Sequence, residues 1–181
     1  MPGRLTLSAL AAVLALLARS MPAQPPASAP PPHPCAAPEF HHFDFWIGDW
    51  DVTGPKGKLL GTNRVISILD GCAIQEHWVD THQSRGESYT MYDAKRKTWH
   101  QSWVDDTGSL LVNEGGFHDG KLILTDSGMP AAGGPGHVTQ RWTWTKVDAD
   151  HVRQVAEGTK DNGKTWTVTF PGLYTRRRAG K

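Results

Sequence analysis

The sequence predicts an all-β fold, an up-and-down antiparallel β-barrel of about ten strands. From position 48 onward, short segments rich in Val, Ile, Thr, Trp and Tyr alternate with turn residues, and helical periodicity is absent. Apart from residues 126–136, the connections are short, so that each can join only antiparallel neighbours. An open sheet of this many amphipathic strands leaves two exposed edges, and closure removes both. A two-sheet sandwich is the alternative.

The N-terminal residues precede the predicted domain. Arg4 is followed by an apolar run of about 14 residues, LTLSALAAVLALLA, which suits the core of a secretion signal and is short for a membrane span. We expect residues 1–23 to be a signal peptide, cleaved after Ser20 or Ala23, with an uncleaved anchor as the alternative. No cysteine follows the run directly, so we expect no lipid anchor. Residues 24–34 form a proline-rich linker, because proline fixes φ and removes donors.

The segment EFHHFDFWIGDWDV leads into the first strand. Its apolar residues repeat every three to four positions over 38–47, which predicts a short helix that plugs one end of the barrel. Gly48 and Trp50 then form a G-x-W pattern, typical of lipocalin-like barrels. There the Trp packs beneath the floor against an Arg that follows the last strand, a place that Arg176 or Arg177 occupies here.

The predicted barrel domain spans residues 35–176, and residues 177–181 form a basic tail. The connection 126–136 (DSGMPAAGGPG) is long and rich in Gly and Pro. The predicted strands are 49–53, 62–69, 73–81, 87–92, 98–104, 109–116, 121–125, 137–146, 151–159 and 164–174.

Cys35 and Cys72 are the two cysteines of the chain. In an exported protein such a pair predicts one disulfide, which joins the entry segment to the barrel wall. Two free thiols are the alternative.

The charge balance argues against a nucleic-acid partner. The chain has 19 basic and 18 acidic residues, and removal of Arg4 and Arg19 with the signal peptide leaves 17 against 18. The tail clusters positive charge at Arg176, Arg177 and Arg178, but without a basic surplus this is too little to hold a phosphate backbone.

The stretch TKDNGKTW, residues 159–166, has the form of the S/T-x-D-x-G-x-T-W hairpin of sialidases. Sialidases carry several copies on propeller blades, whereas this chain carries one. Asp161 can accept backbone N–H bonds across the turn, Gly163 supplies positive φ, and Trp166 is expected to pack into the core. Glycosidase chemistry needs two positioned carboxylates. We interpret the motif as a turn.

Candidate site residues follow from the alternation of side chains along strands. If Ile74 and Trp78 point inward, Glu76 does so as well. A buried carboxylate without a partner costs several kcal/mol or becomes protonated, so an internal Glu76 needs Arg141, Gln101, Gln154 or water beside it. The sequence leaves open which face of the Arg141 strand points inward. The candidate ligand-binding residues are Glu76, Trp78, Gln101, Trp103, Arg141 and Gln154.

We expect no metal and no cofactor. The nine histidines lack the spacing of a zinc site, and His77 and His82 have opposite parity on their strand. A related ten-stranded barrel family binds haem through a late histidine; here only His151 is late, and it lies beside a turn. The sequence also lacks a G-x-S-x-G elbow and a P-loop, which disfavours a nucleophilic hydrolase.

Several segments together resemble DUF1579-type proteins over nearly all of residues 35–174. They are FDFWIGDWDV, GCAIQEHW, GESYTMYD, TWHQSWVDDTG and EGTKDNGKTW…GLY. The resemblance implies a lipocalin-like barrel in a secreted or periplasmic bacterial protein. It implies little chemistry, because that family has no agreed activity.

We therefore expect a periplasmic or secreted protein that holds a small, partly apolar ligand in an aromatic-lined barrel, without stable membrane anchoring after signal cleavage. One alternative is a cofactor-independent isomerase, cyclase or hydratase. In it Glu76 acts as acid and base, and Arg141 or Gln101 stabilises charge. The other is a structural module with a filled barrel.

Overall fold

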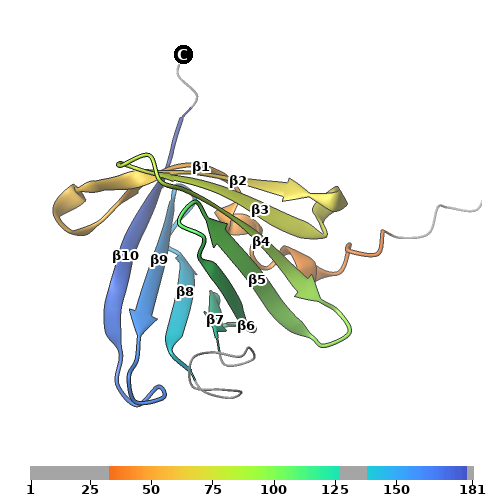
Figure 1. Ribbon diagram of the computed structural model, residues 1–181. Coiled ribbons are helices and arrows are strands. Elements are labelled where there is room, and N and C mark those ends of the chain that lie inside the picture. The colour runs from red at the N-terminus through yellow and green to blue at the C-terminus, as the bar shows by residue number, and fades with distance from the viewer. Residues whose placement is uncertain (1–32, 127–137, 179–181) are drawn as a thin grey trace, which may run out of the picture. The chain divides into compact units, whose positions relative to one another are not determined.

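A computed structural model describes residues 33–126 and 138–178. Within these residues, ten antiparallel strands form a closed barrel, as the sequence predicts (Figure 1). Each strand pairs with its neighbours in sequence, and β1 pairs with β10 to close the sheet. The sandwich alternative is wrong. The predicted signal peptide 1–23 and most of the linker 24–34 lie outside the described residues.

The strand boundaries differ from the expected ones mainly at the ends. β10 begins at Thr167 and not at 164, because Thr165 is held in the preceding turn by Asp161. The expected start of β8 at 137 lies outside the described residues. The strands are β1 (Gly48–Thr53), β2 (Leu59–Ile68), β3 (Ala73–Asp80), β4 (Arg85–Asp93), β5 (Thr98–Asp105), β6 (Leu110–His118), β7 (Lys121–Thr125), β8 (Gln140–Lys146), β9 (His151–Gly158) and β10 (Thr167–Arg176).

Two short 3-10 turns precede β1 in place of one helix. They are η1 (Pro38–His41) and η2 (Asp44–Trp46), and two more, η3 (Pro55–Gly57) and η4 (Leu69–Gly71), flank β2. Phe43 and Trp46 of the entry segment are fully buried. Both rings pack against Trp144 of β8, with centroids 5.5 and 5.7 Å away, so burial of these rings fixes the segment on the core.

The disulfide predicted from the cysteine pair is present. Cys35 is bonded to Cys72, with 5.2 Å between their Cα atoms. It joins the entry segment to the residue that precedes β3. In the described parts of the chain, no helix has both the length and the apolar character needed to cross a bilayer.

The seam between the first and last strands follows the G-x-W prediction. The Arg176 guanidinium lies 4.2 Å from the centre of the Trp50 ring, and its Nη1 donates to the carbonyl oxygen of Ile47 at 3.0 Å. Gly48 has φ +151°, and a Cβ there would overlap the Arg176 guanidinium. The stacking residue is therefore Arg176, whereas Arg177 lies 3.2 Å from Asp51.

An apolar core, here called the floor, fills part of the barrel. It contains the two rings of the entry segment and inward-facing residues of eight strands, which bury one another. Its members are Phe43, Trp46, Trp50, Val52, Val65, Ile74, Trp99, Leu122, Leu124, Trp144, Val152 and Tyr174.

Candidate ligand-binding cavity

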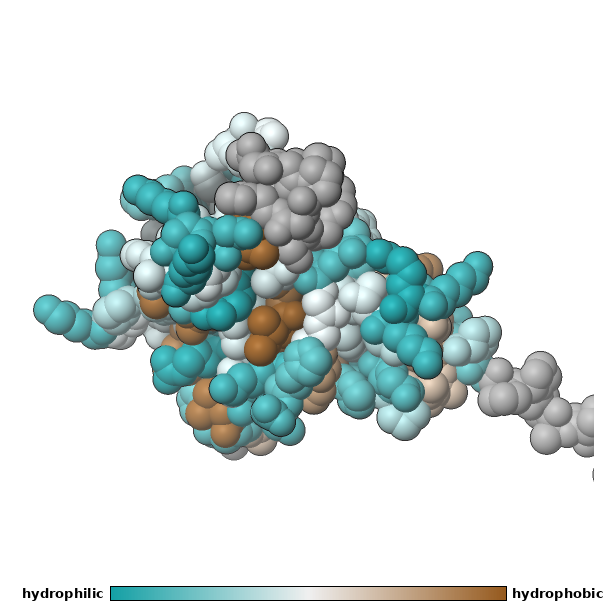
Figure 2. All heavy atoms as spheres, turned by 90° about the horizontal axis from the view of Figure 1, so that it is seen from below, coloured by the Kyte–Doolittle hydropathy of each residue, from teal (hydrophilic) through white to brown (hydrophobic). Residues whose placement is uncertain are grey.

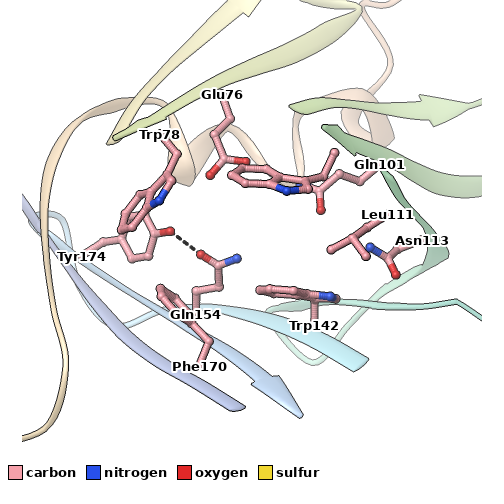
Figure 3. Close-up of a pocket in the computed structure, with 10 residues that line it drawn as sticks. Glu76, Trp78, Gln101, Leu111, Asn113, Trp142, Gln154, Phe170 and Tyr174 are labelled. Carbon is pink, nitrogen blue, oxygen red and sulfur yellow. Dashed lines mark hydrogen bonds between the residues drawn. The ribbon is translucent and has the colours of Figure 1, made fainter. Parts of the chain in front are cut away.

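A cavity of about 180 Å³ lies inside the barrel (Figure 3). Its labelled side chains come from strands on opposite sides of the barrel and point into one space. The lining residues are Glu76, Trp78, Gln101, Trp103, Leu111, Asn113, Trp142, Gln154, Phe170 and Tyr174.

The side chains along β3 and β5 show how the cavity is layered. On β3, Ile74 belongs to the floor, Glu76 is buried and polar, and Trp78 lines the cavity. On β5, Trp99, Gln101 and Trp103 repeat that order. Residues two apart on a strand share a face and lie about 6.6 Å apart along it. The cavity therefore has polar side chains next to the floor and aromatic side chains farther from it.

Two further sets of side chains are named from this order. The polar layer consists of Asn63, Glu76, Ser88, Thr90, Gln101, Asn113 and Gln154, all of which are buried. The rim consists of Trp78, Trp103, Leu111, Trp142 and Phe170.

Glu76 is the carboxylate of the polar layer and is 4% exposed. Asn63 Nδ2 donates to Oε1 at 2.6 Å, and Ser88 Oγ donates to Oε2 at 2.6 Å. Burial raises the pKa of Glu76 to about 7, although both hydrogen bonds oppose that rise. Burial favours the neutral form and the two donors favour the ionised form. The resulting pKa lies near neutral pH, so this carboxyl group can change charge there.

The remaining polar side chains extend this network around the barrel. Gln101 Nε2 donates to Ser88 Oγ at 3.3 Å and to Thr90 Oγ1 at 3.0 Å. Tyr174 Oη accepts from Asn63 Nδ2 at 3.4 Å and donates to Gln154 Oε1. Burial and the nearby Glu76 charge raise the pKa of Tyr174 well above its usual range, so its hydroxyl stays a donor.

Some buried polar atoms have no hydrogen-bond partner among the described residues. In the polar layer these are acceptors, the Oδ1 atoms of Asn63 and Asn113. The indole Nε1 atoms of Trp142 in the rim and of Trp46 and Trp144 in the floor also lack a partner. The polar layer thus has spare acceptors, and the spare donors belong to tryptophans.

Two glycines, Gly61 of β2 and Gly86 of β4, leave space for the rim tryptophans Trp78 and Trp103. A Cβ on Gly61 would lie 2.8 Å from the Trp78 ring, and a Cβ on Gly86 would overlap the Trp103 ring. Each indole therefore lies against the backbone of the preceding strand at its glycine. Because the rings cover the wall, they do not fill the centre of the barrel, which is why room for a ligand remains beside them.

A second hollow, of about 320 Å³, shares two residues with the cavity. Trp78 and Phe170 line both spaces, and their rings meet edge to face with centroids 6.2 Å apart. These two rings therefore form the wall between the cavity and the outer hollow, where Lys58, Asp80 and His82 provide charged or polar edges.

The outer surface offers less to a small apolar molecule. Figure 2 shows one face, on which hydrophobic residues form small separate patches among hydrophilic ones. Leu69 and Leu110 are the most exposed large apolar side chains described, at 71% and 65%. Single exposed apolar residues are ordinary on protein surfaces, so these two residues do not indicate a binding site.

Five of the six candidate residues line the cavity together. They are Glu76, Trp78, Gln101, Trp103 and Gln154. The sequence expected Arg141, Gln101, Gln154 or water beside Glu76, but its direct partners are Asn63 and Ser88. Asn63 has the parity of Val65 on β2, and Ser88 has the parity of Tyr92 on β4, a signal that could have identified both.

Arg141 does not reach the cavity. Its strand turns Trp142 and Trp144 inward, so that Arg141 lies on the outer face. There its Nη2 donates to Glu157 Oε2 at 2.6 Å, and its guanidinium lies 4.3 Å from the centre of the Trp166 ring. An aromatic face and a carboxylate therefore stabilise the guanidinium on the outside of the barrel.

The TKDNGKTW stretch forms the turn before β10. Asp161 accepts from the backbone nitrogen of Thr165 at 2.8 Å, and Gly163 has φ +83°. Hydrogen bonds from Thr165 and Thr159 lower the pKa of Asp161 to about 2. Trp166 is only half-buried and does not join the floor, which corrects the expected packing into the core.

None of the described histidines and neither cysteine lines the cavity. His151 is paired with Asp148, 2.8 Å apart, at the start of β9. In the described parts of the chain, one group of three potential metal ligands occurs, His33 with Cys35 and Cys72. Both sulfurs of that group are joined in the disulfide.

The cavity can contact a ligand in two chemically different ways. The rim offers aromatic faces, and the polar layer offers a carboxylate with amide and hydroxyl groups. No family model and no curated protein sequence matches the chain. The kind of ligand is therefore inferred from the side chains that line the cavity.

Proposed function

We propose that this protein binds a small, partly apolar molecule in the barrel cavity. The observation that carries this proposal is a space of about 180 Å³ between the rim and the polar layer. An engineered apolar cavity of about 150 Å³ in another protein accepts benzene. The expected ligand is therefore about one ring with a polar substituent. A structural module with a filled barrel would have no cavity of this size.

The lining also has the composition of a binding site. Small-molecule sites are mostly apolar, with a few placed polar groups that orient the ligand. Here the aromatic rings of Trp78, Trp103 and Trp142 supply flat apolar area. Glu76 and Gln154 supply polar contacts at the inner end. The hydrogen bonds among the polar layer hold these groups in place, so that less conformational freedom is lost on binding.

The proposal extends to family and location. We assign the chain to the DUF1579-type proteins with a lipocalin-like barrel, one end of which the two entry turns close. The pattern of Gly48 and Trp50 with Arg176 supports this assignment. The Cys35–Cys72 disulfide supports export to the periplasm or the medium, because disulfides persist in oxidising compartments.

A matched pair of substitutions tests the site. Leu111 lines the cavity, whereas its neighbour Leu110 is 65% exposed. Leu111→Trp fills the cavity, and Leu110→Trp adds the same indole outside. Native mass spectrometry of the protein from its own host, with thermal-shift assays over a panel of one-ring compounds, measures binding.

We expect a retained molecule or a shift in the wild type and in Leu110→Trp, and neither in Leu111→Trp. Equal binding by both variants places the ligand elsewhere and overturns the proposal. A clean unliganded mass, with no shift for any compound, favours the structural module.

The pKa of Glu76 near 7 favours a second function, acid–base catalysis without a cofactor. A general acid or base works best when its pKa lies near the operating pH. An isomerase, cyclase or hydratase acting on the same small ligand would use this carboxyl group. Conversion of the retained molecule by the wild type, and its loss in Glu76→Gln with binding preserved, would establish this function.

A further inference from the structure

We infer that the ligand is a small organic cation, a protonated amine attached to one ring, with Glu76 as its counter-ion. This inference rests on the proposed binding function and adds the charge of the ligand. It is argued from the charges, the free acceptors and the aromatic rings of the cavity.

The cavity has one acidic group and no basic one. Among the described residues, no Lys, Arg or His lines it, and Glu76 has neutral hydrogen-bond partners. The side chains around Glu76 are Asn63 of β2, Ser88 of β4, Gln101 of β5, Gln154 of β9 and Tyr174 of β10. Of these five, Tyr174 alone titrates. The carboxylate therefore lacks the positive partner that buried charges normally have.

The hydrogen bonds at Glu76 are arranged for an acceptor. Asn63 Nδ2 and Ser88 Oγ each donate to a different carboxylate oxygen. Asn63 points its amide nitrogen at Glu76 although its own Oδ1 then has no partner. A carboxylate oxygen can accept more than one hydrogen bond. An ammonium group, which has donors and no acceptor, matches the remaining acceptor capacity of the Glu76 carboxylate, whereas a second anion does not.

The rim supplies the second element of cation recognition. Trp78, Trp103 and Trp142 line the same space as Glu76, with Phe170 beside them. Aromatic faces attract cations through their quadrupole, and indole does so best. A flat ring can also stack on these side chains. The same wall therefore suits both the ring and the charge of an aryl-alkyl amine.

Three probes of similar shape separate the charge states. Benzylamine is protonated at neutral pH, benzyl alcohol is neutral, and benzoate is anionic. Isothermal titration calorimetry measures each with the purified protein at pH 8 and pH 6. The variants are Glu76→Gln, which keeps the shape, and Glu87→Gln, which removes a half-exposed carboxylate on the outer face.

At pH 8 we expect benzylamine to bind at least about tenfold more tightly than benzyl alcohol, with benzoate weakest. A cation competes with the Glu76 proton, whose pKa is about 7, so benzylamine should bind about tenfold more weakly at pH 6. Glu76→Gln should remove both effects, and Glu87→Gln should keep them. If Glu76→Gln does not fold, the pH dependence of the wild type decides.

Equal affinities for benzylamine and benzyl alcohol, or tightest binding of benzoate, overturn the cation inference. The binding function survives that result, because the cavity then still holds a ring. If none of the three probes binds, the inference is also overturned, and the Leu111→Trp and Leu110→Trp comparison decides separately whether the cavity binds anything.

Discussion

The Arg176 guanidinium lies 4.2 Å from the centre of the Trp50 ring and joins the last strand to the first. The two residues are also paired in register between β1 and β10. The guanidinium occupies the space where a side chain on Gly48 would lie. Closure of the barrel therefore depends on a glycine, a tryptophan and an arginine that act together.

Arg176→Ala should lower the free energy of unfolding by about 1–3 kcal/mol, because it removes the cation–π contact and the hydrogen bond to Ile47. Arg176→Lys should recover only part of this loss, since an ammonium lacks the flat fork of the guanidinium. Urea denaturation measures both. Arg178→Ala, at an 89% exposed side chain, is the control and should change little. Equal effects at both positions would refute a role in closure.

Loss of the disulfide should destabilise the domain without changing its fold. The Cys35–Cys72 bond spans 37 residues, for which chain entropy gives about 3–4 kcal/mol. We expect the double variant Cys35→Ser, Cys72→Ser to unfold at a lower urea concentration than the wild type. A reductant should lower the unfolding midpoint of the wild type and leave that of the double variant unchanged. Should reductant leave the wild-type midpoint unchanged, the bond does not contribute to stability.

Glu76 should make stability depend on pH. Its folded pKa of about 7 exceeds the ordinary 4.5, so the folded state keeps a proton that the unfolded state releases between these values. The stabilisation is complete below about pH 4.5 and is lost as pH rises through 7. The loss is on the order of 3 kcal/mol. Denaturation at pH 5 and pH 8 should show this decrease in the wild type and in Glu87→Gln, but not in Glu76→Gln.

Gly86→Ala should disturb the cavity from outside its lining. The new methyl group overlaps the Trp103 ring, which has to leave the wall. Overpacking of this kind costs about 1–3 kcal/mol. Tryptophan fluorescence should shift, and benzylamine should bind more weakly. Gly158→Ala is the matched control, because its nearest side-chain atom lies at an ordinary 3.5 Å. If both variants bind alike, Trp103 does not shape the site.

Asp161→Ala should loosen the turn and leave binding intact. Asp161 accepts bonds from Thr165 and from Thr159, which hold residues 159–165 together. Without them, limited proteolysis should cut this turn faster than in Lys164→Ala, a change at an exposed neighbour. Benzylamine affinity should stay at the wild-type value in both variants. A large loss of affinity in Asp161→Ala alone would mean that the turn takes part in binding.

Local patterns were sufficient to predict the wall of the barrel. Alternation placed Glu76 with Trp78, and Gln101 with Trp103, on one face each, and both pairs line the cavity. On β8 alternation did not decide which face points inward. One face carries Trp142 and Trp144, and the other carries Arg141, Thr143 and Thr145. The structure turns the tryptophans inward, since Trp144 completes the floor.

Cross-strand neighbours could not be predicted in the same way. Ser88 is paired with Glu76 between β3 and β4, and Asn63 reaches it from β2. Register fixes such pairs, and register depends on turns and bulges that one sequence specifies only weakly. The role of Gly61 and Gly86 could not be predicted either, because it depends on the indole rings that pack against them from the next strand.

The sequence by itself determined the strand order, a closing seam between Trp50 and an arginine at 176 or 177, and the disulfide, because these follow from turn length, alternation and residue type. Only the tertiary structure decided what surrounds Glu76, that Arg141 lies outside, and that a space remains between the tryptophans. Those features depend on which side chains from distant strands meet inside one barrel, and packing of all strands together sets that outcome.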